Sequence, residues 1–132
     1  MLGTKSFEDP LSEMHHALRA PRRRAAVRIM SNSEEATMSV RSLARQIAAD
    51  EHGVPTAQAT GEPYRNVYNA LSQTHLPTLA AAGIVIYDPK RQRISTGTNL
   101  GAASIIIEMT TPTVQLLFDE KEHATEDTII GD

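Results

Sequence analysis

Five polar residues in one short segment carry side chains suited to recognising nucleic-acid bases. At helical spacing, the stretch from Tyr64 to His75 gathers them on one side, here called the polar face: Arg65, Asn66, Asn69, Ser72 and Gln73. Arg can pair bidentately with guanine, and Asn or Gln with adenine. Lys and Glu, which fill ordinary exposed helix faces, are missing from it. We therefore expect contacts to bases or phosphates, the alternative being a solvated helix face.

A second group of candidate residues consists of cations outside this segment. Lys90, Arg91 and Arg93 lie near a predicted hairpin tip, where they could meet backbone phosphates or the minor groove. Charged hairpin tips also occur simply to keep a sheet edge soluble. Arg41, near the start of a predicted helix, could meet a phosphate too.

Four further arginines fit two interpretations equally well. They could contact a polyanion, or their long stems could cover helix faces and pair with acids such as Glu34 and Glu35. These residues are Arg22, Arg23, Arg24 and Arg28.

Metal and catalytic chemistry have no comparable pattern. The chain has no cysteine, and its five histidines form no convincing i, i+4 pair with carboxylates, so we expect no metal or cofactor. No nucleophile elbow, phosphate loop or carboxylate pair is present, so we expect no enzyme activity. His75 is expected to cap or pack at the end of the polar segment.

Hydropathy patterning predicts three helices before that segment. The first begins at Asp9, the second at Pro21, and the third after an N-cap at Ser39, ending at Gly53. Their expected inward residues are Leu11, Met14 and Leu18; Ala26, Val27 and Met30; and Val40, Leu43, Ala44, Ile47 and Ala48. A loop should then lead to Tyr64.

Pro77 interrupts the polar segment. An unchanged helix would point Leu76 into the polar face, whereas proline disfavours helical geometry at the preceding residue and lacks a backbone N–H. We therefore expect the helix to reset at Leu76, with a new turn from Pro77 to Gly83. "IVIY" and "QRIST" then predict two strands joined by a turn at "DPKR".

The composition indicates one globular domain. The chain has 132 residues, 40% apolar and 22% charged, and no apolar run near the roughly 20 residues of a membrane span. No basic and apolar leader opens the chain, so we expect a cytoplasmic location. Residues 1–100 hold 12 of the 13 basic and 9 of the 16 acidic residues, a net +3, whereas residues 101–132 have a net −6.

The C-terminal part divides into an apolar segment, 99–118, and an acidic tail, 119–132. A helical seam fits Ala102, Ile105, Ile106, Met109, Thr113, Leu116 and Leu117. Two short strands fit the same residues, and we favour the helix. We expect the segment to pair two chains as a homodimer, the alternative being that it folds back on its own domain.

Residues 1–98 together form a winged helix-turn-helix pattern, which consists of three helices, a polar-faced helix and a basic hairpin. Three stretches of the chain resemble haloarchaeal winged-helix domains, which are similar to ArsR- and PadR-type transcriptional regulators. They are "ALRAPRRRAAVRIM", "SVRSLARQIAA" and, above all, "YNALSQTHLPTLAAAGIVIYD". The resemblance implies a dimeric archaeal regulator that binds double-stranded DNA sequence-specifically, with the Tyr64 segment as recognition helix. A protein-interaction module and a ligand-responsive repressor are the alternatives.

Overall fold

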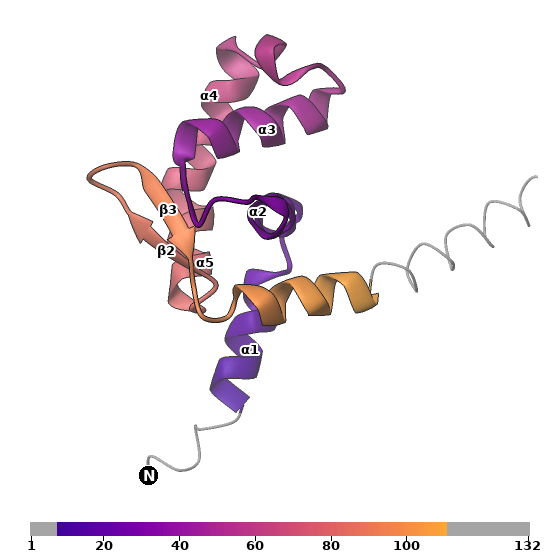
Figure 1. Ribbon diagram of the computed structural model, residues 1–132, viewed down its shortest axis with the longest axis vertical. Coiled ribbons are helices and arrows are strands. Elements are labelled where there is room, and N and C mark those ends of the chain that lie inside the picture. Colours follow the sequence, from indigo (N-terminus) through magenta and orange to yellow (C-terminus); the bar gives the residue numbers. More distant parts are fainter. Residues whose placement is uncertain (1–7, 111–132) are drawn as a thin grey trace, which may run out of the picture.

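The computed structural model describes residues 8–110, which form a mostly helical fold with a small β-sheet (Figure 1). The helices are α1 (Glu8–Ala17), α2 (Pro21–Asn32), α3 (Val40–His52), α4 (Gly61–Ala70) and α5 (Leu76–Ala81), with a 3-10 turn η2 (Thr56–Gln58) and a π-type turn η3 (Leu71–His75). The strands are β1 (Thr37–Ser39), β2 (Val85–Asp88) and β3 (Arg93–Thr96). The predicted class, a mostly α fold with a β-hairpin wing, is confirmed.

The sheet has three strands where the sequence predicts two. The order is β1-β3-β2 and both pairings are antiparallel, so Ile94 lies between Met38 and Tyr87. The hairpin is predicted correctly, but β1 was missed, because three residues are too few to show the alternation of a strand. Ile94 is fully buried, and the sheet closes one side of the core.

The predicted inward faces of α2 and α3 are confirmed. Every apolar residue assigned to those faces is buried, and the side chain of Ser39 accepts a hydrogen bond from the N–H of Ser42 at 3.0 Å, as an N-cap should. Gly53 ends α3 with φ 64°. Leu11 is an exception, since it is 56% exposed on α1 while Met14 and Leu18 are buried.

The polar segment begins earlier than predicted. α4 starts at Gly61, not at Tyr64. Pro63 needs no backbone N–H partner in the first helical turn, and the carboxylate of Glu62 favours the positive end of the helix dipole. Both residues therefore belong to the helix instead of the preceding loop.

The helix does not break at Pro77. Leu76 keeps helical geometry, with φ −68° and ψ −42°, and its N–H donates to the carbonyl of Leu71, five residues earlier. The prediction that Leu76 leaves the helix is therefore wrong, because a wide turn resets the phase instead. Such a turn accommodates the missing N–H of proline, and it leaves Leu71, Leu76 and Leu79 all fully buried.

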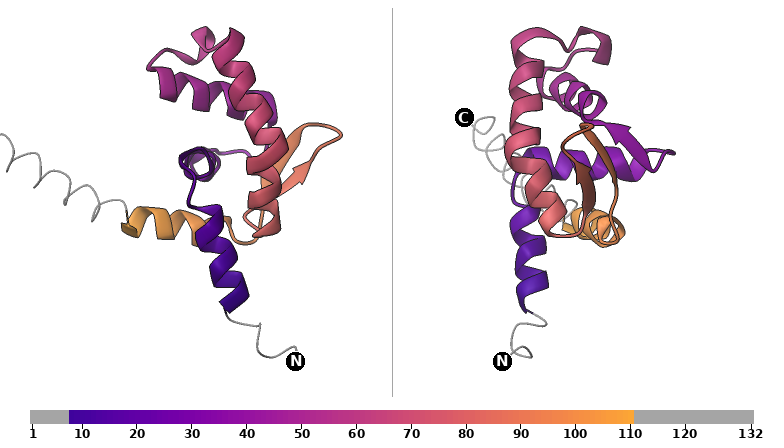
Figure 2. Two further views of the ribbon diagram at one scale, coloured as in Figure 1. Left: turned by 180° about the vertical axis from the view of Figure 1, so that it is seen from behind. Right: turned by 90° about the vertical axis from the view of Figure 1, so that its left-hand side faces the viewer.

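Residues 100–110 form a last helix, which confirms the helical prediction for that part; residues 111–118 and the acidic tail lie outside the described residues. Leu100, Ala103 and Ile107 pack against the core, whereas Ile105 is 57% and Met109 is 71% exposed. Figures 1 and 2 show this helix extending on the opposite side of the molecule from the hairpin. No helix within residues 8–110 is long and apolar enough to cross a membrane.

A close backbone contact joins the last helix to the end of α5. The N–H of Gly97 donates to the carbonyl of Ile84, and that of Asn99 donates to Gly83, both at 2.9 Å. A Cβ atom at Gly97 would lie 2.4 Å from the carbonyl oxygen of Gly83. Only glycine fits there without moving the backbone.

We predict that Gly97→Ala lowers the free energy of unfolding by at least about 1–3 kcal/mol, because the added methyl group overlaps backbone atoms. Gly101→Ala is the matched control: its Cβ would meet nothing within 4 Å, and alanine in a helix should add about 0.5–1 kcal/mol. Urea denaturation measures both. Equal effects from the two variants would contradict the close contact.

Candidate nucleic-acid interface

Most of the polar face is open to solvent. Arg65, Asn66, Asn69 and Gln73 are exposed, and their side chains have no hydrogen bond or ion pair within the described part of the chain. On the opposite side of the same helix, Val67 is fully buried. The helix therefore exposes three amides and a guanidinium that have no partner among residues 8–110.

Ser72 differs from the rest of the polar face. It is half-buried, and its hydroxyl donates to Oε1 of Gln92 at 2.9 Å. The Gln92 amide nitrogen in turn donates to the Tyr87 hydroxyl at 2.9 Å and to the Pro89 carbonyl at 2.8 Å. This relay ties η3 to the hairpin, so Ser72 is a positioning residue in this structure.

Gln92 occupies an unusual backbone conformation. Its φ of 51° is the only positive φ of a non-glycine residue among residues 8–110. A side chain in this region costs on the order of 1 kcal/mol or more unless the surroundings hold it, and here three hydrogen bonds of its own amide do so. Neither Gln92 nor Tyr87 has a periodicity or motif that would identify this role from the sequence.

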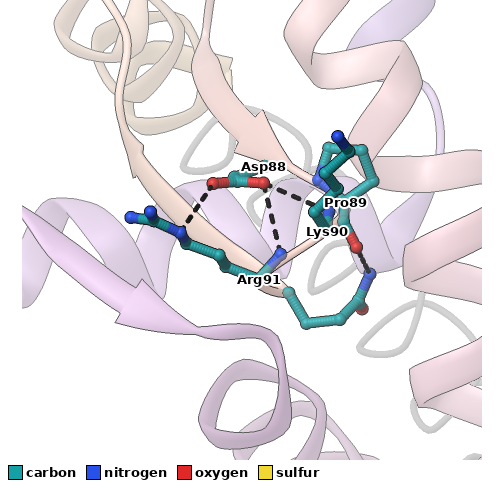
Figure 3. Close-up of polar contacts among 5 residues, drawn as sticks. Asp88, Pro89, Lys90 and Arg91 are labelled. Carbon is teal, nitrogen blue, oxygen red and sulfur yellow. Dashed lines mark hydrogen bonds and ion pairs between the residues drawn. The ribbon is translucent and has the colours of Figure 1, made fainter.

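An aspartate organises the tip of the hairpin. Asp88 Oδ1 accepts hydrogen bonds from the N–H groups of Lys90 at 3.1 Å and Arg91 at 3.2 Å, while Oδ2 lies 4.0 Å from Nε of Arg91 (Figure 3). An exposed ion pair of that length contributes little. Lys90 and Arg91 are both exposed, so these two predicted cations are available at the turn.

Arg93 lies in β3 instead of at the tip. Its Nη2 is 3.3 Å from Oγ1 of Thr37, so it reaches across the sheet to β1. Arg41 lies at the start of α3, just after the end of β1. It is exposed and has no partner among the residues described. The two arginines thus flank β1.

Arg45 adds a cation that sequence reasoning did not assign. Its guanidinium lies 5.8 Å from the ring centroid of Tyr64, and the Tyr64 and Tyr68 rings are 6.0 Å apart. A cation over an aromatic face is attracted by the ring quadrupole. This contact connects the exposed side of α3 to the start of α4.

Three of the four arginines at residues 22–28 have structural partners. Arg22 makes a bidentate contact to Glu51 at 2.7 and 2.9 Å, and Arg24 donates to the carbonyls of Leu18 and Arg19. The suggested pairing with Glu34 and Glu35 is therefore not the one formed. The hydrogen bond from Arg22 holds the pKa of Glu51 below its usual value.

Arg23 is the only buried charged residue among residues 10–110, and it braces η3. It donates to the carbonyls of Ala17 at 2.7 Å and His16 at 3.1 Å, and its Nη1 lies 3.1 Å from Nδ1 of His75. Because an arginine can only donate, Nδ1 must accept, which requires neutral His75 with its proton on Nε2. Burial, followed by the charge of Arg23, lowers the pKa of His75. The expected packing role of His75 is confirmed.

No comparable arrangement for holding a metal ion is found in the part of the chain that the structure describes. Within residues 8–110 there is no group of three or more histidine, aspartate or glutamate side chains that could hold a metal ion. A shallow, mostly apolar hollow of about 310 Å³ lies between α1 and α5, lined by Glu13, His16, Pro77, Thr78, Ala81 and Ala82.

Fold and surface together define a small helix-rich domain with a three-stranded β wing and an exposed amide-bearing helix. Residues 15–95, more than half of the chain, match the family model described as a domain of unknown function (DUF7344), and the chain belongs to that family. The matched region spans α2 to β3, and so includes both the polar face and the hairpin. Neither the curated proteins nor the solved structures gave a match.

We predict that His75 makes the stability depend on pH. An unfolded histidine has a pKa of about 6.5, and the pKa of His75 is lower in the fold. The stabilisation by neutral His75 is therefore complete above about pH 6.5 and is lost as the pH falls through the lower, folded-state pKa. Chemical denaturation across this range should show a steeper decline for the wild type than for His75→Gln, whose amide can accept from Arg23 without titrating.

His15→Gln, a substitution of an exposed histidine on α1, is the control and should keep the wild-type curve. If His75→Gln also kept that curve, the titration of His75 would not be linked to the stability of the fold.

Proposed function

We propose that this protein is a sequence-specific, double-stranded DNA-binding transcriptional regulator without catalytic activity, acting in the cytoplasm where an archaeal chromosome lies. The observation that carries this proposal is the exposed set of unpaired amides on α4 and η3, fixed beside a basic hairpin. Asn66, Asn69 and Gln73 have no partner in the described chain, and Ser72 ties their helix to the hairpin through Gln92.

The dimensions of the two elements suit a duplex. A helix about 10–12 Å across fits the B-DNA major groove, which is about 12 Å wide. The hairpin cations Lys90 and Arg91 would then meet phosphates, contacts that fix orientation but do not read sequence. The resemblance to ArsR- and PadR-type regulators supports the same assignment, with the helix reading bases and the hairpin contacting the DNA backbone.

The salt concentration decides which contacts contribute most to the affinity for DNA. If the host accumulates molar salt, the Debye length shrinks to about 3 Å and counterion release loses its drive. Hydrogen bonds and shape must then supply more of the affinity. A face with three amides and a single cation suits such conditions better than a lysine-rich one.

The test is binding of the full chain to duplex DNA, measured by fluorescence anisotropy with competitor DNA. Asn69→Ala or Arg65→Ala should weaken specific binding by about 1–3 kcal/mol per lost base contact. Lys90→Ala should weaken binding to all sequences alike and reduce the salt slope by about one charge.

Asn32→Ala is the matched control, because Asn32 is an exposed amide at the end of α2, outside the polar face and the hairpin. It should bind as the wild type does. If the folded variants all bound duplex as the wild type does, the assignment of the contact residues would be wrong. If the wild type did not bind duplex, the DNA-binding proposal would fail, and a winged-helix protein-interaction module would become the better hypothesis.

We also propose that the protein is a homodimer that pairs through the last helix. The predicted seam residues Ala102, Ile105 and Met109 are exposed in the single chain, although Ile106 is half-buried. A different face of the same helix contacts the core. Pairing on the side away from the hairpin (Figure 1) would leave both polar faces free for half-sites about one helical turn apart.

We predict that Ile105→Glu converts the dimer to a monomer, because a charge would be buried in an apolar seam. Analytical ultracentrifugation measures the mass. Leu11→Glu is the control, since Leu11 is equally exposed at 56% but lies on α1, and it should leave the dimer intact. A monomeric wild type, or a dimeric Ile105→Glu variant, would contradict pairing through this helix.

A further inference from the structure

The polar face has an unusually narrow set of functional groups. Its free side chains are three primary amides and one guanidinium, with no carboxylate. The hydroxyl of Ser72 is already used in its bond to Gln92. A partner surface therefore meets donors and acceptors side by side, in the fixed pairing that an amide provides.

Only one base edge matches that pairing in the major groove. Adenine presents an acceptor, N7, next to a donor, the N6 amino group, and an Asn or Gln side chain can satisfy both. Guanine presents two acceptors, which suit an arginine. Cytosine offers a donor alone, and thymine an acceptor beside a methyl group.

The spacing of the amides sets the length of the site. Asn66, Asn69 and Gln73 are three and four residues apart, so they share one helix face. At 1.5 Å per residue the first and third are about 10 Å apart along the axis. Base pairs are 3.4 Å apart, so a helix lying along the groove covers about three base-pair steps with these side chains.

The wide turn fixes the last amide of the set. Gln73 lies in η3 next to Ser72, and Ser72 is hydrogen-bonded to the hairpin. Gln73 is thus held in a fixed position relative to both the helix and the hairpin, whereas Asn66 and Asn69 are held by α4 itself. Arg65 is one residue before Asn66 and so is turned about 100° from it, toward one border of the face.

Accordingly, we infer that α4 and η3 recognise a short adenine-rich core of about three or four base pairs in the major groove, with Arg65 contacting a guanine at its border. This inference rests on the proposed DNA-binding function and adds the class of sequence. Asn66, Asn69 and Gln73 are the specificity-determining residues, and Ser72 is a positioning residue.

The first experiment selects binding sites from a library of randomised duplexes with the full chain, followed by sequencing. Recovered sites should share an adenine run bordered by guanine. In the best recovered duplex, replacing one contacted A·T pair by G·C should weaken binding about 5- to 150-fold.

Inosine·cytosine pairs separate major-groove from minor-groove recognition. An inosine·cytosine pair has the minor-groove groups of A·T and the major-groove groups of G·C, so it should weaken binding as much as G·C does. If it bound like A·T, or if the recovered sites lacked adenines, this inference would be overturned while the DNA-binding function stood. If no duplex bound at all, both would fail.

Variants locate the preference on the protein. Asn69→Ala and Gln73→Ala should lose the discrimination between A·T and G·C at one position each while retaining residual binding to any duplex. Asn32→Ala should keep the full discrimination. Circular dichroism confirms folding of each variant, and an unchanged preference in folded Asn69→Ala and Gln73→Ala would assign the discrimination to other residues and overturn the inference.

Discussion

The five-residue turn η3 is the constraint on which the rest of the domain depends. One wide turn lets Leu71 and Leu76 both reach the core although they are five residues apart. The same turn carries Ser72, which bonds to the hairpin, and His75, which accepts from Arg23. The core, the β wing and the end of α1 are therefore all joined at this single irregular point. Turns of this kind occur frequently at functional sites.

The arginines illustrate how one residue type serves two purposes. Arg22, Arg23 and Arg24 all have partners within the fold, and the buried guanidinium of Arg23 satisfies the carbonyls at the end of α1. Arg65 and Arg41 have no such partners in the part of the chain described. The two interpretations that the sequence left open for the cluster are thus decided for these three arginines, which support packing, while the isolated Arg41 and Arg65 face solvent.

Much of this fold could be predicted from periodicity and capping. The five inward residues of α3, the cap at Ser39 and the ends at Gly53 and Gly83 all follow from local rules. Features that depend on contacts distant in sequence could not be predicted. β1 exists because Met38 lies opposite Ile94, and Gln92 takes a positive φ because of partners at positions 72, 87 and 89. The exposure of Arg65, Asn66, Asn69 and Gln73 was predictable, whereas the engagement of Ser72 was not.

The relay from Ser72 through Gln92 to Tyr87 has a consequence for how the domain meets a partner. Two contact elements that are hydrogen-bonded to each other beforehand arrive as one rigid body, and little conformational freedom remains to be lost on association. A rigid body cannot adjust its helix and its hairpin separately to an imperfect target. If the domain binds DNA as proposed, a small difference in groove width would affect the fit of the helix and the hairpin together. The shape of the duplex, as well as its base edges, would then decide which sequences bind.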